Sequence, residues 1–232
     1  MTQNRTILVV AAHPDDEVLG CGATIAQHVQ KGNTVNILIL AEGATSRASN
    51  RDRSQWKSQL SALAVAAHKA SDILGAASVT LDNFADNRMD GYELLDVIKV
   101  VEQAIDQHQP EIVYTHHSGD VNIDHRRIHE AVITACRPVP GHPVKSLLFF
   151  EIPSSTEWQP PGSAPIFAPN WFVDVTETLN LKLKALEAYQ SEMRPWPHPR
   201  SLQAVEHLAR WRGASVGVEA AEAFILGRQL VM

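Results

Sequence analysis

Short apolar runs alternate with amphipathic segments along the first two thirds of this 232-residue chain. Residues 35–41 (VNILILA) are almost continuously apolar, which is typical of a strand buried on both faces of a parallel sheet. Between such runs, apolar residues recur at the spacing of a helix. This alternation predicts an α/β protein with a doubly wound, mostly parallel sheet.

The apolar pattern also sets the expected bounds of each element. Strands are predicted at 7–11, 35–41, 78–81, 112–115, 147–152 and 171–175. Helices are predicted at 18–31, 55–74, 94–107, 124–136, 179–191 and 202–212. We expect one domain over residues 1–232, with a core of about 1–152. The C-terminal elaboration of about 153–232 begins with an irregular loop rich in Pro, Ser and Trp.

Composition and charge argue against several classes of protein. The net charge of -6 disfavours a general nucleic-acid or anionic-membrane binder, which needs a basic face. The two cysteines, Cys21 and Cys136, fit reduced thiols better than a disulfide framework. The polar start of the chain is not typical of a signal peptide, and no apolar stretch is long enough to span a membrane. We therefore expect a cytoplasmic protein.

The segment 11–17 (AAHPDDE) places one imidazole and three carboxylates directly at the end of the first predicted strand. In open α/β sheets, ligands gather at that edge. Adjacent carboxylates repel each other, so a positive group is expected beside them. His13 together with one of the two aspartates, Asp15 or Asp16, suits zinc or a similar divalent ion. The simpler interpretation is a helix N-terminus that carries favourable carboxylates.

A second polar segment, 115–125 (THHSGDVNIDH), follows the fourth predicted strand. The carboxyl ends of parallel strands meet at one edge of a sheet, so this segment is expected to face the first. A catalytic zinc usually takes three protein ligands and one water. The segment can therefore supply the third ligand.

Both motifs resemble those of the LmbE-like, or PIG-L type, zinc-dependent N-acetylglucosaminyl deacetylases. The resemblance rests on AAHPDDEVLGCGATIAQH near the N-terminus and on DVNIDHR at 120–126. It extends to FEIPSSTEW at 150–158, PNWFVDV at 169–175 and the RG…G…AEAF pattern at 212–224. It therefore spans most of the chain.

The resemblance implies a site and a reaction. His13, Asp16 and His125 would bind one zinc ion per chain, and Asp15 would be the general base that releases acetate from an N-acetylated amino sugar or sugar conjugate. Asp124 would orient an imidazole. The implied fold is a Rossmann-like three-layer sandwich without a dinucleotide, and no Gly-rich phosphate motif follows the first strand. Members of the family are often homo-oligomers.

One position departs from the family pattern. Many members carry a catalytic histidine where this chain has Asn122. Either Asn122 donates a hydrogen bond to the oxyanion, or a histidine from another segment replaces it. The candidates are His116, His117 and His198, the last from a Pro-rich loop of this chain or of a neighbouring subunit.

Substrate contacts are expected from loops at the same edge of the sheet. The candidates are Arg53, Asp86, Asn87, Arg88 and His116. By resemblance, Arg53 and Asp86 would hold sugar hydroxyls or an anionic substituent. An ordinary salt bridge of Arg53, and turn chemistry for residues 86–88, remain open.

Two other functions remain open. A metal-dependent phosphoesterase would use two ions, but the sequence lacks an obvious second set of bridging carboxylates. A non-catalytic zinc- or sugar-binding module would have no need of Asp15. The sequence names neither the substrate nor the metal, for which cobalt and iron are alternatives to zinc.

Overall fold

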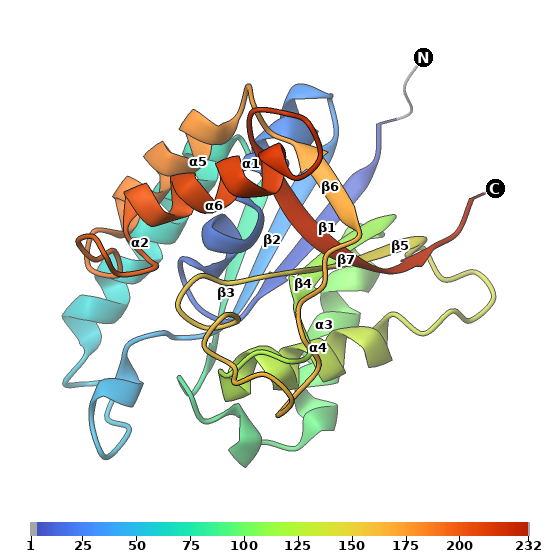
Figure 1. Cartoon of the computed structure of the whole chain (residues 1–232). Helices are drawn as coiled ribbons and strands as arrows, with labels where there is room; N and C mark the ends of the chain where they lie inside the picture. Colours follow the sequence, from blue (N-terminus) through green and yellow to red (C-terminus); the bar gives the residue numbers. More distant parts are fainter. Residues whose placement is uncertain (1–3, 232) are drawn as a thin grey trace.

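A single seven-stranded sheet organises the computed structural model, which describes residues 4–231 (Figure 1). The strand order is β3-β2-β1-β4-β5-β7-β6. The first five strands run parallel, and β7 is antiparallel to both β5 and β6. The strands are β1 Thr6–Ala11, β2 Thr34–Ala41, β3 Ser78–Phe84, β4 Ile112–His116, β5 Ser146–Phe150, β6 Trp171–Asp174 and β7 Ala221–Gln229.

Helices cover both faces of the sheet. The α-helices are α1 Asp16–Gln30, α2 Lys57–Leu74, α3 Leu94–His108, α4 Ile123–Ala135, α5 Leu179–Leu186 and α6 Leu202–Ala214. Short 3-10 helices are η1 Thr45–Arg47, η2 Met89–Gly91 and η3 Glu187–Tyr189. In Figure 1, α2, α5 and α6 lie on one side of the sheet and α3 and α4 on the other.

The side chains of β1 explain this layering, because a strand points alternate residues to opposite faces. Ile7 and Val9 belong to the core shared with α1, α2 and α5. Leu8 and Val10 belong to the core shared with α3 and α4. Both faces of β1 are therefore buried under helices. The predicted three-layer α/β architecture with a mostly parallel sheet is confirmed.

The structure corrects several predicted elements. Strand β7 is not predicted by the pattern, because the buried charge of Glu222 interrupts its apolar run. The predicted strand 147–152 ends at Phe150, and the predicted helix 179–191 divides into α5 and η3. Residues 153–170 form no helix or strand, as expected for the irregular loop. Within residues 4–231, no helix is long and apolar enough to cross a membrane.

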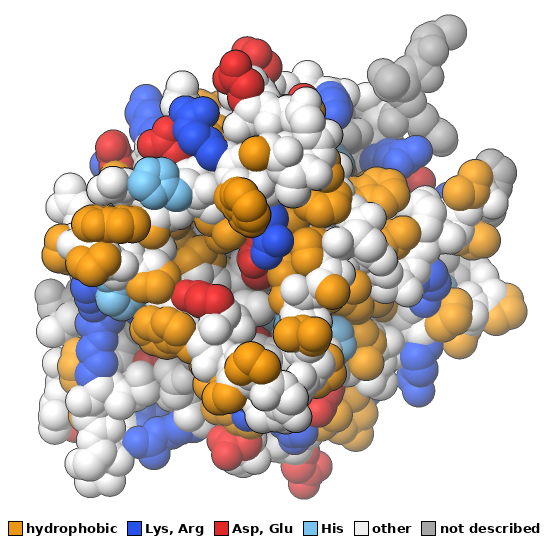
Figure 2. Space-filling model, in the orientation of Figure 1, with side chains coloured by type: hydrophobic (Ala, Val, Ile, Leu, Met, Phe, Trp, Pro, Cys, Tyr) orange, Lys and Arg blue, Asp and Glu red, His pale blue; other side chains and the backbone are white. Residues whose placement is uncertain are grey.

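Surface charge is dispersed on the face drawn in Figure 2. Lys and Arg side chains lie singly among acidic and apolar ones there. This face therefore lacks the continuous basic surface that a general nucleic-acid binder needs.

The buried charge of Glu222 caps a kink in α1. Cys21 has φ −149° and ψ 25°, which breaks the helix into two stretches. The N–H groups of Ala23 and Thr24 donate to the Glu222 carboxylate at 3.2 and 2.7 Å. Lys182 Nζ lies 2.6 Å from Glu222 Oε1 and donates to the Leu19 carbonyl at 2.8 Å. The pair thus satisfies backbone groups on both sides of the kink.

Removing the cation of this pair should destabilise the fold. We expect Lys182→Met to lower the free energy of unfolding by about 3–5 kcal/mol, because Glu222 would stay buried without its partner. The matched control is Lys184→Met, an exposed lysine of the same helix, with an expected change below about 0.5 kcal/mol. Urea unfolding measures both, and equal stabilities of the two variants would contradict the role of the pair.

A second group, the partly buried His28, makes stability depend on pH. The His28 ring nitrogens lie 2.9 Å from the Tyr114 hydroxyl and 3.0 Å from Asn33 Nδ2. Burial, with smaller effects of Lys31 and Arg5, lowers the pKa of His28 to about 4. The unfolded chain, with a histidine pKa of about 6.5, therefore binds more protons between pH 6.5 and 4. Stability contributed by neutral His28 is lost as the pH falls through this window.

We expect acidification from pH 7 to pH 5 to cost about 1–2 kcal/mol through His28 alone. His28→Gln keeps a hydrogen-bonding side chain without a titrating proton, so its stability should fall less over the same interval. Urea unfolding at the two pH values measures the difference. Parallel losses in the two proteins would assign the pH dependence to other groups.

Candidate active site

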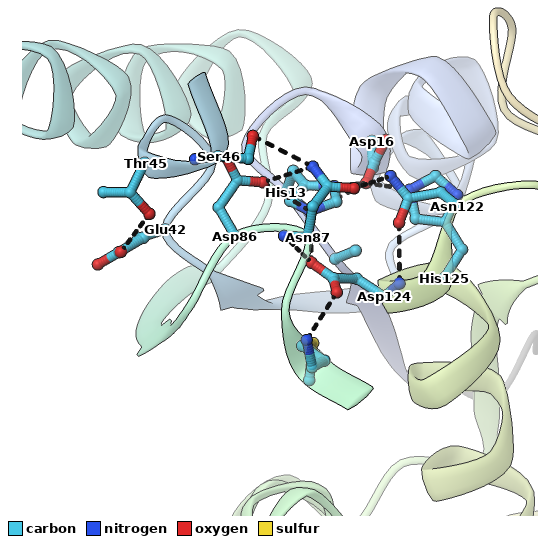
Figure 3. Close-up of polar contacts among 12 residues, drawn as sticks. His13, Asp16, Glu42, Thr45, Ser46, Asp86, Asn87, Asn122, Asp124 and His125 are labelled. Carbon is cyan, nitrogen blue, oxygen red and sulfur yellow. Dashed lines mark hydrogen bonds and ion pairs between the residues drawn. The ribbon is translucent and has the colours of Figure 1, made fainter. Parts of the chain in front are cut away.

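A polar pocket of about 170 Å³ opens where the loops after β1, β2, β3 and β4 meet. Two C-terminal segments complete it, the loop after β5 and the segment between η3 and α6. Figure 3 shows the side chains at its base converging from different loops. The lining residues are His13, Pro14, Asp15, Asp16, Gly43, Ser46, Arg47, Asp86, Asn87, Asn122, His125, Ile152, Ser154, Ser155, Glu192 and Arg200.

Two imidazoles flank one carboxylate oxygen at the base of the pocket (Figure 3). Asp16 Oδ2 lies 3.1 Å from His13 Nδ1 and 3.1 Å from His125 Nε2. Among residues 4–231, neither buried nitrogen of His125 has a hydrogen-bond partner of acceptable angle. Two nitrogens and one oxygen within 4.8 Å of one another can hold a metal ion, and this donor set suits zinc. The structure thus brings the three predicted ligands together.

Asp120 contacts the second ring nitrogen of His125, Nδ1. Its Oδ1 lies 3.1 Å from His125 Nδ1. Asp120 also accepts hydrogen bonds from the Asn122 N–H at 2.8 Å, from Thr156 Oγ1 at 2.7 Å and from the Ser155 hydroxyl. Burial opposes protonation of His125, but the charges of Asp16 and Asp120 raise its pKa to about 9. Our prediction assigned no role to Asp120, although this residue opens the DVNIDHR motif at 120–126.

Asp124 orients the imidazole of the opposite motif. Its Oδ2 lies 2.9 Å from His13 Nε2, and its carboxylate accepts the N–H groups of Asn87 at 2.7 Å and Met89 at 3.0 Å. Asp86 Oδ1 lies 3.3 Å from the same His13 nitrogen. His13, Asp86 and Asp124 thus form a second group of possible metal ligands, but this group shares His13 with the first.

Asp15 is held in an unusual backbone conformation. Its φ of 118° lies where L residues are rarely found. The Asp15 N–H donates to Glu17 Oε2 at 3.1 Å, and Glu17 accepts the Tyr189 hydroxyl at 2.5 Å. Arg200 Nη1 lies 3.2 Å from Asp15 Oδ2. Burial and the charge of Asp16 raise the pKa of Asp15, and Arg200 opposes this rise.

The candidates for the missing motif histidine lie in different places. Asn122 lines the pocket but caps α4, since its Oδ1 accepts the Asp124 N–H at 2.8 Å and its Nδ2 donates to Asn87 at 2.9 Å. His116 is fully buried, accepts the Ala12 N–H at 2.8 Å and stacks on His125.

His117 and His198 are also engaged elsewhere. The His117 Nε2 lies 2.9 Å from the Pro165 carbonyl. His198 accepts the Arg200 N–H at 3.0 Å, and its ring meets Trp158 edge-on. Within the described residues, the pocket lining includes neither of them and also excludes His116.

Some of the predicted substrate residues line the pocket and others lie outside it. Asp86 and Asn87 line the pocket. Arg53 lies outside the lining and pairs with Glu42 Oε2 at 2.8 Å. Arg88, also outside it, donates to the Ser49 carbonyl at 2.9 Å. Arg53 thus forms the salt bridge that the sequence left open, and Arg88 makes a contact that braces its loop. The substrate contacts of both residues stay predictions.

The arginines that do line the pocket are Arg47 and Arg200. Arg47 Nη2 lies 2.8 Å from both oxygens of Glu192. Our prediction missed all three residues. Their only signal in the sequence is position, in the polar loop after β2 and in the segment before α6.

Comparison with known proteins agrees with this geometry. Residues 8–136 match the PIG-L family, described as GlcNAc-PI de-N-acetylase. YaiS of Escherichia coli K12, an uncharacterized deacetylase, is 32% identical over 195 residues, covering 82% of this chain and 92% of YaiS. A probable N-acetyl-alpha-D-glucosaminyl L-malate deacetylase 2 of Bacillus anthracis is 25% identical over 194 residues, covering 83% of both chains.

A solved structure shows the same fold. The N,N'-diacetylchitobiose deacetylase of Pyrococcus horikoshii superposes with a TM-score of 0.76 at 19% identity, covering 97% of this chain and 84% of that one. At this identity, the likeness concerns the fold alone. The family match and the identity with YaiS are the stronger findings, and they confirm the resemblance of the two motifs: the chain belongs to the PIG-L family.

Proposed function

We propose that this protein is a metal-dependent hydrolase that removes the acetyl group from an N-acetylated amino sugar or sugar conjugate. The observation that carries the proposal is the convergence of His13, Asp16 and His125 beside the carboxylate of Asp15. The names of the relatives support the reaction class, since those from Escherichia coli and Bacillus anthracis are both called deacetylases.

One zinc ion per chain fits the site best. The Nε2 of His125, which has no hydrogen bond of acceptable angle within residues 4–231, and the Asp16 oxygen between two imidazoles are the donors such an ion takes. When bound, zinc supplies Lewis acidity, which makes water a stronger acid and polarises a carbonyl. The second group of ligands shares His13, and Asp124 already accepts two backbone N–H groups. A single ion is therefore favoured over the pair that a phosphoesterase would use.

Asp15 is the proposed general base. Its side chain lies in the pocket beside the metal ligands, and its raised pKa suits a group that must take a proton. Asp15 removes a proton from the attacking water as the water oxygen bonds to the acetamide carbon. The same proton then passes to the nitrogen as the C–N bond breaks, so that acetate and an amine leave.

The pocket favours a small polar substrate. Its volume of about 170 Å³ is below the roughly 300–1,000 Å³ of sites that bury drug-sized ligands. We infer that it accepts an acetamido group with part of one sugar ring. Asp86 and Asn87, with Ser46 beside them, offer acceptors and donors for ring hydroxyls. Homo-oligomeric assembly stays a prediction.

Neutralising the base should separate turnover from metal binding. We expect Asp15→Asn to retain the metal but to lower the rate of acetate release by about 10²–10⁴-fold. The assay is acetate release from a panel of N-acetylated sugars by zinc-loaded protein, with metal content measured on the same samples. Asp106→Asn on the exposed face of α3 is the control and should keep the parental rate. Normal turnover by Asp15→Asn would refute the assignment of the base.

Loss of the carboxylate behind His125 should weaken metal binding. We expect Asp120→Asn to reduce zinc affinity by about 10–100-fold, because the ligand loses its orienting partner. Competition with a chromophoric chelator measures this, again against Asp106→Asn. Unchanged zinc affinity would mean that Asp120 only stabilises the loop after β5 through its hydrogen bonds and does not orient His125.

A further inference from the structure

The proposed reaction places negative charge on the acetamide oxygen, and Arg200 is well placed to receive it. Its guanidinium lines the pocket, with Nη1 3.2 Å from Asp15 Oδ2. A water that Asp15 deprotonates, and the carbonyl that this water attacks, must therefore lie close to Arg200. Preorganised donors at such an oxygen are often the largest single contribution to catalysis.

The fold fixes the backbone of Arg200. Its N–H donates to His198 Nδ1 at 3.0 Å, and its carbonyl accepts the Arg194 N–H at 3.3 Å. The next residue, Ser201, caps α6 by accepting the Ala204 N–H at 3.0 Å. The backbone that carries the side chain is therefore fixed, and the contact of Nη1 with Asp15 holds the guanidinium at the pocket.

The charge of Arg200 is available to a ligand. Glu192 is the nearest other carboxylate, at 4.0 Å, but both of its oxygens already accept Arg47 at 2.8 Å. The Arg200 Nε is buried and has no hydrogen-bond partner among residues 4–231. Because this Nε is not accessible from the pocket, the donors that can reach a ligand are on the Nη atoms. Among residues 4–231, Nη1 contacts Asp15 Oδ2 and Nη2 has no hydrogen-bond partner.

The other candidate donors are committed elsewhere. Asn122 caps α4, and its amide donates to Asn87. His116 is fully buried behind His125. The ring of His198 packs against Trp158, outside the pocket lining.

We propose that Arg200 is a catalytic residue that donates a hydrogen bond to the acetamide oxygen as this oxygen becomes negative. The assignment rests on the proposed function. As the water oxygen bonds to the carbonyl carbon, the C=O π pair moves onto the oxygen that Arg200 contacts. When the C=O bond re-forms, the C–N bond breaks and the nitrogen takes the proton held by Asp15. Arg200 stays protonated throughout.

The first test compares Arg200→Gln and Arg200→Ala with Arg212→Gln. Arg212 is a matched control, because it is also partly buried and pairs with the carboxylate of Glu151 outside the catalytic pocket. We expect both Arg200 variants to lose about 10²–10³-fold in kcat with little change in KM. Their metal content and unfolding midpoints should match the control. Added guanidinium ion should raise the rate of Arg200→Ala and leave the parent unaffected.

The second test does not need turnover. Methylphosphonate mimics the tetrahedral intermediate of deacetylation, in which the negative charge lies on oxygen, and calorimetry with zinc-loaded protein measures its binding. We expect Arg200→Gln to weaken binding by about tenfold or more, the loss typical of a hydrogen bond to a charged group. Binding to Arg212→Gln should equal that of the parent.

The outcomes distinguish the two proposals. A kcat of Arg200→Gln close to that of the parent overturns the role of Arg200, as does a loss of kcat that follows loss of metal or that guanidinium does not reverse. If no N-acetylated sugar is hydrolysed but methylphosphonate binding depends on Arg200, the proposed function fails and the oxyanion contact stands. Equal methylphosphonate binding by parent and Arg200→Gln, or none by either, overturns the contact.

Discussion

Six buried carboxylates at one edge of the sheet impose the constraint on which the rest of the site depends. They are each at most 3% exposed and belong to Asp15, Asp16, Glu17, Asp86, Asp120 and Asp124. Burying so much like charge is unfavourable unless positive groups and donors surround it. The two imidazoles of the metal site, the backbone N–H groups of the loop after β3 and one arginine lie at hydrogen-bond or ion-pair distance from these groups. A divalent ion would complete the compensation.

The parts of the site that could be predicted from sequence are those encoded locally. His13, Asp15 and Asp16 stand next to one another, directly after a strand whose apolar run is unmistakable. His125 follows β4 at the start of α4, and parallel strands bring those two ends together by geometry alone. Local patterning and sheet topology therefore indicate where these residues meet. The separate roles of Asp15, Asp16 and His125 come from the resemblance to the family and stay predictions.

The remaining residues depend on tertiary contacts with no local signature. Arg200 approaches Asp15 across 185 positions of sequence, and Glu222 reaches the kink of α1 across nearly 200. The sequence does not distinguish a charged residue that faces solvent from one that faces a buried partner in the fold. For this reason the sequence predicts a substrate contact for Arg53, which pairs with Glu42 in the fold, and predicts none for Arg200.

The placement of β7 between β5 and β6 has a consequence for synthesis of the chain. Strand β6 pairs with β7 alone, so residues 171–174 have no strand to join until the ribosome has released residues 221–229. The proposed metal ligands and the proposed base all lie within the first 125 residues, whereas Arg200 lies in the segment that this last pairing encloses. The pocket wall that carries Arg200 is therefore closed off only after residues 221–229 have been made, later than the segments that carry His13, Asp16 and His125.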